Sequence, residues 1–208
     1  HTQYRLVMDY QDLSHNQSIL GMMVFNDCLV PVYDADRKEA KYIKANEGTV
    51  LIDNGLLSHK QMRRGRFTVG HELGHWLLHK KKYQRNHGRL SLSNSGIETF
   101  IKCRSVDVEN RKRIFTSDND WMEWQADYMS SALLMPKTAF TKVVHREFQS
   151  VGINSSYYQR GSSIALDLWI EFLAYQLADV FCVSVTAAKI RFENLRLVRP
   201  PTQNQQLC

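Results

Sequence analysis

The chain has 208 residues, of which 43% are hydrophobic and 23% charged, as in a globular protein with one good core and room for a small appended module. No apolar run approaches the ~18 residues of a membrane-spanning helix, so no membrane association is expected. We interpret the net charge of +6 mainly as solvated surface rather than as a nucleic-acid-binding face. The widely and irregularly spaced cysteines are Cys28, Cys103, Cys182 and Cys208. Their spacing excludes a dense disulfide framework and predicts a reducing compartment, the cytoplasm.

Extended segments are predicted in the first part of the chain. Residues 19–33 are expected to form two short strands, with Pro31 placing the second one at a sheet edge. Residues 41–53 are expected to be extended as well, and a substrate backbone could pair with an edge of these strands. A helix follows at roughly 60–80. The polar residues after it are interpreted mostly as loop, with one more short strand or turn within 95–106.

Helices dominate the second part of the chain. The stretch DWMEWQADYMSSALLM at 120–135 is strongly helical and is closed by Pro136. A further helix is expected at 137–149, a linker at 150–163 and two helices within 164–198. Because strands come first and helices later, without β-α-β alternation, the predicted fold class is α+β.

The stretch RFTVGHELGHWLLH at 66–79 contains two histidines four residues apart. On a helix, His71 and His75 would lie about 40° apart on one face, so that both imidazoles could reach one small cation. Glu72 lies beside them, where a carboxylate could act as a general base toward water. This is the zinc-protease interpretation of H-E-x-x-H. The alternative is an amphipathic helix that contains these residues by chance, and the motif alone does not decide between them.

A catalytic zinc ion usually has a third protein ligand. The candidates are His79, His87, Cys103, Glu123 and Asp127. His79 would lie about 12 Å further along the helix axis than His71, so we expect it beside the site rather than on the metal. Glu123 lies in a separate helix and could bind the metal, while Asp127, one turn later, accepts the outer N–H of one of the histidines. The alternative is an ordinary exposed pair of carboxylates.

RFTVGHELGHWLLH followed by MEWQADYMSSALLMP resembles the ImmA/IrrE family of metallopeptidases. That family has an R-F-T-x-x-H-E-x-x-H-x-x-x-H helix and then a helix of the form E-x-x-A-[ND]-x-x-[AS]-x-x-L-L-M-P. The resemblance covers roughly residues 19–140, with one small departure at Ser130, where many relatives have alanine. It implies that His71, His75 and Glu123 bind one zinc ion and that Glu72 is the general base. Mn²⁺ could replace zinc, because the open catalytic position could accept other divalent ions.

The resemblance also implies an architecture and a role. We expect a zincin-like peptidase domain over residues 1–150, with a small N-terminal β-sheet and the H-E-x-x-H helix. A helix–turn–helix-like C-terminal module would follow over 151–208, with a disordered tail from about residue 200. The implied function is a zinc endopeptidase that cleaves an XRE-type helix–turn–helix transcriptional repressor, so that stress, mobile-element or prophage genes are derepressed.

A competing hypothesis comes from the basic charge and from LADVFCVSVTAAKIRFENL at 177–195, which has the rhythm of a helix–turn–helix. In this hypothesis the protein is a zinc-containing regulator that binds DNA or the repressor without cutting it. Lys189 and Arg191 would be exposed on the second helix. Because this helix offers few base-reading side chains, we favour helix packing or protein recognition over DNA contact.

Two features near the motif stay open in the sequence. Cys103 could be a half-buried structural cysteine, or its thiolate could bind zinc and keep the enzyme latent. A second oxyanion donor is also expected, and the candidates are His79, Tyr83, His87 and Tyr128.

Overall fold

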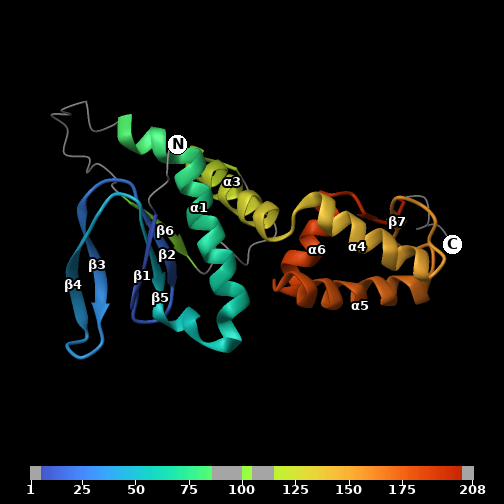
Figure 1. Cartoon of the computed structure of the whole chain (residues 1–208), viewed down its shortest axis with the longest axis horizontal. Coiled ribbons are helices and arrows are strands. Elements are labelled where there is room, and N and C mark those ends of the chain that lie inside the picture. The colour runs from blue at the N-terminus through green and yellow to red at the C-terminus, as the bar shows by residue number, and fades with distance from the viewer. Residues whose placement is uncertain (1–5, 86–99, 105–114, 203–208) are drawn as a thin grey trace. The chain divides into compact units, whose positions relative to one another are not determined.

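The structure is a computed structural model that describes residues 6–85, 100–104 and 115–202 (Figure 1). The chain divides into two compact units, His1–Ser130 and Ser131–Cys208. This division comes earlier in the chain than the boundary predicted between residues 150 and 151. The physical reason is the helix α4 (Lys137–Ser150), whose buried aromatic side chains belong to the core of the second unit. The end of the expected disordered tail, 203–208, lies outside the described residues.

The first unit contains a four-stranded sheet. Its strands, in spatial order, are β1 (Val7–Gln11), β5 (Thr49–Asp53), β2 (Ile19–Val24) and β6 (Phe100–Arg104). β1 is parallel to β5, and β2 is antiparallel to both of its neighbours. Among the described strands, β1 and β6 are therefore the edges of this sheet, and both lie outside residues 19–53. β1 escaped prediction because it is short and most of its side chains are exposed, so it lacks the buried apolar run that marks β2 and β5.

The predicted strand pair at 19–33 is real, but its two strands belong to different sheets. β3 (Cys28–Asp34) pairs with β4 (Glu39–Ala45) in an antiparallel two-stranded sheet. Pro31 is tolerated there because each strand of a two-stranded sheet is an edge. β2 is instead buried on both faces, which explains its nearly continuous apolar sequence ILGMMV.

The sheet's two faces bury different cores. On one face, side chains of β2, β5 and β6 pack against α1 (Met62–Arg85), the helix predicted at 60–80, which follows two short 3-10 turns. On the other face, side chains of β2 and β5 pack against the β3–β4 pair. α1 therefore lies directly on the sheet, with its buried face toward β2.

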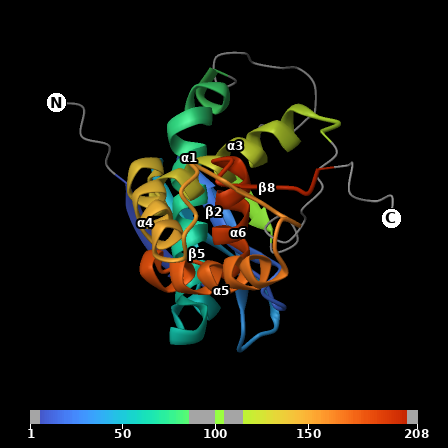
Figure 2. The same ribbon diagram turned by 90° about the vertical axis from the view of Figure 1, so that its right-hand side faces the viewer.

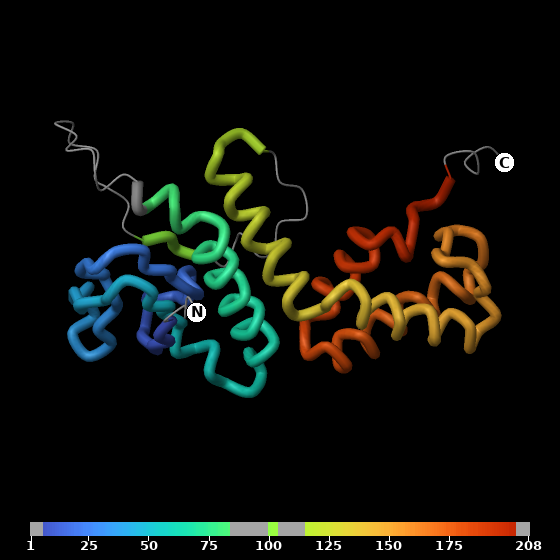
Figure 3. Tube along the Cα trace, turned by 45° about the horizontal axis from the view of Figure 1, so that its top comes forward, coloured from blue at the N-terminus to red at the C-terminus, as the bar shows by residue number. Residues whose placement is uncertain are grey.

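α3 (Asp118–Leu134) runs beside α1, as the trace in Figure 3 shows. The two helices come close because α1 has glycine at the contact. A Cβ at Gly74 would lie 3.0 Å from Cα of Ala126, and one at Gly70 would lie 2.5 Å from Oγ of Ser130. The Ser130 hydroxyl also donates a hydrogen bond of 2.8 Å to the carbonyl of Phe67. Thus Ser130, at a position where many members of the resembled family have alanine, ties the two helices together.

The second unit consists mainly of α4, α5 (Ile164–Phe181) and α6 (Val185–Asn194), shown in Figure 2. Ser184 accepts a hydrogen bond from the backbone N–H of Ala187 and so caps α6. A short parallel pair, β7 (Tyr158–Gln159) with β8 (Val198–Arg199), joins the linker to the segment after α6.

One prediction for α6 is wrong. Arg191 is not on the exposed face, since it is only 2% exposed and its Nε donates a hydrogen bond to the carbonyl of Met135. Lys189 forms an ion pair with Glu171 of α5. The reason is the position of α6 against its own unit, which directs these long side chains inward.

Within the described residues, no single helix is long and apolar enough to span a membrane. α5 and α6 reach such a composition only together, and they are bent by 107° relative to one another.

Candidate metal centre

Three side chains from two helices converge inside the first unit. Nε2 of His71 lies 2.9 Å from Nε2 of His75 and 3.2 Å from Oε2 of Glu123, and Nε2 of His75 lies 3.4 Å from Oε1 of Glu123. All three residues are buried. We call them the triad. Ligands that share one zinc ion lie roughly 3 to 4 Å apart, because each bond is about 2.0–2.2 Å long. The triad therefore has the spacing of a metal site.

The helices position the triad for simple reasons. His71 and His75 are one turn apart on the face of α1 that meets α3, as the helical spacing predicted. Glu123 reaches them because the glycines of α1 let α3 approach. Trp124, the next residue, points outward and is 41% exposed. The inward face of α3 thus holds the metal candidates and its outward face holds aromatic side chains.

Outer hydrogen bonds orient both imidazoles. Nδ1 of His71 lies 2.8 Å from Oδ1 of Asp127, and Nδ1 of His75 lies 3.0 Å from Nδ1 of His79. Nε2 of His79 lies 2.9 Å from Oε1 of Gln125. Since the amide oxygen of Gln125 accepts, His79 donates through Nε2 and accepts at Nδ1, and His75 donates through its own Nδ1. Both triad imidazoles therefore present the lone pair of Nε2 to a metal.

Gln125 is the one residue of this network that the sequence reasoning missed. The sequence shows that Gln125 lies between Glu123 and Asp127, two residues already predicted to be part of the site. Nothing in the spacing alone indicated that it would reach a histidine at the far end of the motif. The structure shows that contact because His79, one turn beyond His75, lies opposite it.

Glu72 lies next to the triad and is fully buried. Neither of its carboxylate oxygens has a hydrogen-bond partner among the described residues. Burial raises its pKa to about 8; the charge of His71 opposes this rise, and that of Glu123 adds to it. Its space is provided by Gly21 of β2, where an added Cβ would lie 2.6 Å from Oε1 of Glu72.

The charges of the triad are strongly coupled. Burial opposes ionisation of Glu123, but its hydrogen bonds to His71 and His75 outweigh burial and hold its pKa well below the usual range. Burial lowers the pKa of His75. For His71 burial acts in the same direction, but the Cys103 sulfur and the carboxylates of Asp127 and Glu123 raise the pKa above its usual value. An entering cation would therefore displace a proton from His71.

The donor set fits zinc. Two imidazole nitrogens and one carboxylate oxygen are zinc ligands, whereas Ca²⁺ and Mg²⁺ favour oxygen donors. Oε2 of Glu123 is buried, and its 3.2 Å contact with Nε2 of His71 is not aligned as a hydrogen bond. A bound cation would satisfy this oxygen, which is otherwise costly to bury.

The candidate oxyanion donors have other contacts. His79 bonds to His75 and Gln125, and Tyr83 is buried against Phe25 in the core between α1 and the sheet. Tyr128 lies half-exposed on α3. His87 lies outside the described residues. These contacts favour structural roles for His79 and Tyr83.

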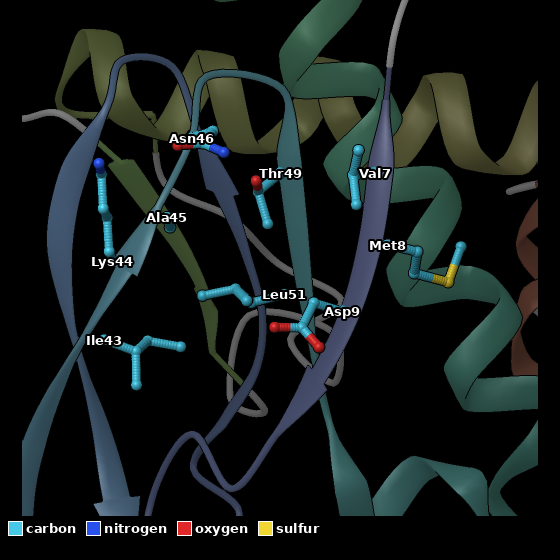
Figure 4. Close-up of a pocket in the computed structure, with 9 residues that line it drawn as sticks. All are labelled: Val7, Met8, Asp9, Ile43, Lys44, Ala45, Asn46, Thr49 and Leu51. Atoms are coloured by element: carbon cyan, nitrogen blue, oxygen red, sulfur yellow. The ribbon is translucent and has the colours of Figure 1, made fainter.

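A surface pocket lies elsewhere. It is lined by residues 7–9 of β1, residues 43–46 of β4 and its turn, and two residues of β5, and Figure 4 shows their side chains. None of the triad residues contributes to it. We take the triad as the candidate site, because its buried nitrogen and oxygen donors can bind a metal ion. The mixed side chains that line the pocket indicate no particular function.

Cys103 is fully buried, so the expectation of a half-buried cysteine is wrong. It lies on β6 in register with Gly21 of β2. Its sulfur is within 4.8 Å of ligand atoms of His71 and Glu72. Burial raises the pKa of its thiol, against the opposing effect of His71. Cys103 is therefore next to the site but outside the triad.

Two histidines one turn apart, a glutamate from a second helix and a buried carboxylate beside them define the metallopeptidase class in this α+β fold. The family comparison gives the same answer. The chain belongs to the Peptidase_M78 family, since the family model described as IrrE N-terminal-like domain matches residues 49–193, well over half of the chain. This match confirms the resemblance to ImmA/IrrE proteins. A search of curated proteins finds no match.

Proposed function

We propose that this protein is a zinc-dependent endopeptidase in which the triad holds the metal and Glu72 is the general base. The observation that carries the proposal is the triad itself, with a buried, unpartnered carboxylate beside it. Membership in a metallopeptidase family supports it. Mn²⁺ could replace zinc in such an open site.

The side chains of this chain would divide the work as follows. When bound, zinc supplies Lewis-acid chemistry toward the scissile carbonyl and the attacking water. Glu72 takes a proton from that water at its carboxylate and later delivers it to the leaving amine. The pKa of about 8 is that of the metal-free site. A cation bound beside Glu72 would lower this pKa and favour the carboxylate form that accepts the proton. Asp127 and His79 hold the two imidazoles in orientation.

The substrate would be an extended protein segment. Among the described strands, β6 is at the edge of the sheet next to the site, so a peptide backbone could pair along it. From the family resemblance we propose a cytoplasmic XRE-type helix–turn–helix repressor as the substrate, cut to derepress stress, mobile-element or prophage genes.

The test uses the repressor encoded nearest to this gene. Zinc-loaded wild-type protein and Glu72→Gln are each incubated with it, and the products are weighed by intact mass spectrometry. One new cleavage with wild type, and none with Glu72→Gln, is the expected result. Equal cleavage by both proteins would contradict the assignment of the base. An uncut repressor that is retained on zinc-loaded protein would favour a non-cutting regulator instead.

The C-terminal module is proposed to recognise protein rather than DNA. α5 and α6 cross at 107° after a short break, a geometry found in helix–turn–helix pairs. However, Arg191 is buried and Lys189 is paired with Glu171, so both basic side chains of α6 are engaged within the unit. We therefore expect the full chain to show no salt-dependent binding to duplex DNA. Strongly salt-dependent binding would support the competing DNA-binding regulator.

A further inference from the structure

No step of the proposed reaction uses Cys103, although it lies beside the base. Cys103 and Gly21 face each other on neighbouring strands, so their side chains leave the sheet on the same face. Gly21 is the residue whose missing Cβ makes room for Glu72. Ile101, two residues before Cys103, packs in the core against α1. The Cys103 sulfur is thus directed at α1 and the catalytic carboxylate.

His71, Glu72 and Cys103 form a second group of metal-ligand type. One nitrogen, one carboxylate oxygen and one sulfur, one from each residue, lie within 4.8 Å of one another. We call these three residues the thiol cluster. Two ligands on one zinc ion lie at most about 4.4 Å apart, given bonds of about 2.0–2.3 Å. Small side-chain adjustments would therefore close the cluster on a cation.

The carboxylate of Glu72 is an independent sign that something binds here. It is fully buried, and both oxygens are without hydrogen-bond partners among the described residues. A buried carboxylate with no partner is costly, and a cation beside it would remove that cost.

We propose that the thiol cluster is a second site for a thiophilic divalent cation such as Zn²⁺ or Cd²⁺, alternative to the triad. A sulfur ligand favours these ions over Mg²⁺, Ca²⁺ and Mn²⁺. Nδ1 of His71 contacts Asp127, so both sites need Nε2 of His71 and only one of them can use it at a time. Binding replaces the thiol S–H bond by a sulfur–metal bond, and the proton leaves to solvent.

The consequence for regulation rests on the proposed function. A cation in the thiol cluster would take Glu72 as a ligand, so the base would no longer be free to accept a proton. The triad would then be the active position of the metal and the thiol cluster an inactive one. Excess soft metal would inhibit the enzyme by this route.

The experiment is a Cd²⁺ titration of the metal-free full-length protein, followed by ultraviolet absorption of the thiolate-to-cadmium charge-transfer band. In Glu123→Gln the triad is broken and the thiol cluster is intact. This variant should develop the band and saturate it at one equivalent. Adding Cys103→Ala should abolish the band, whereas adding Cys28→Ala, the matched control at a cysteine of β3, should leave it unchanged.

A second substitution controls for the case in which the band is lost because the Cys103→Ala variant misfolds. Adding Glu72→Gln to Glu123→Gln removes a different ligand of the thiol cluster, from α1 instead of β6, and should weaken Cd²⁺ binding at least tenfold. A band that survives Cys103→Ala, or Cd²⁺ bound without any band, overturns the second site. These outcomes would leave the proposed function intact. The proposed function fails on a different result, namely if the wild-type protein does not bind one equivalent of zinc.

Discussion

At the scale of single residues, Glu72 combines full burial with the lack of a hydrogen-bond partner. Its folded-state pKa of about 8 exceeds the usual carboxyl value of 4.5. Between these values the folded protein keeps a proton that the unfolded chain has lost. In the metal-free protein, the contribution of Glu72 to stability should therefore fall as the pH rises from about 4.5 to about 8, by at most about 1.4 kcal/mol per pH unit.

Glu72→Gln removes this titration. In the presence of a chelator, the variant should gain stability relative to wild type as the pH rises through that interval, measured as the free energy of unfolding in urea. Glu193→Gln, at an exposed carboxyl group, is the control and should follow the wild-type curve. Parallel curves for wild type and Glu72→Gln would show that Glu72 is already ionised at pH 5.

Gln125 contacts His79, which contacts His75, so we expect it to influence metal binding through these two histidines. Gln125→Leu removes the acceptor for Nε2 of His79, so His79 no longer holds His75 in the tautomer that presents Nε2 to the metal. Zinc affinity, measured by competition with a chromophoric chelator, should fall about 10- to 100-fold. Gln125→Glu keeps an acceptor oxygen and should retain most of the affinity. Equal affinities of Gln125→Leu and wild type would refute the relay.

At the scale of elements, the site depends on how closely two helices approach. β2 carries Gly21 and α1 carries the histidine pair. α3 brings Glu123, the proposed third ligand, close to them because the facing positions of α1 are glycines. Most strand and helix positions were predictable, since strongly apolar or periodic segments carry a local signal for these elements. The pairing of β3 with β4 instead of β2 was not, because strand partners are chosen by long-range packing.

Gly74→Val tests this helix contact. The new side chain would meet the backbone of Ala126 at about the 3.0 Å already reached by a Cβ, and it would push α3 away from α1. We expect a loss of about 1–3 kcal/mol in stability and weaker zinc binding, because Glu123 moves with α3. Leu78→Val, at an exposed position of α1, controls for the branched side chain. A stable Gly74→Val with unchanged zinc affinity would mean that α3 does not need this contact.

At the scale of the whole molecule, the two units have separate cores, and the triad lies within the first. Family membership spans both units, because the matched residues run from β5 into α6. Metal binding should therefore stabilise the first unit more than the second.

Zinc saturation should slow amide hydrogen exchange in α1 and α3 and leave α4, α5 and α6 nearly unchanged, as measured by mass spectrometry. At a free zinc concentration a thousandfold above Kd, the stabilisation is about 4 kcal/mol. Chelation should reverse the protection. Equal protection of both units would show that they unfold together.

The sequence by itself determined the α+β class, the helix that carries the histidine pair and the family. These depend on local periodicity and on two motifs, which are properties of short segments. Only the tertiary structure decided that Glu123 meets His71 and His75, that Gln125 completes the outer network and that Cys103 lies fully buried beside Glu72. It also placed the aromatic side chains of α4 in the core of the second unit and buried Arg191. The physical reason is that each of these facts depends on residues far apart in the chain, whose contacts are set by the packing of whole elements.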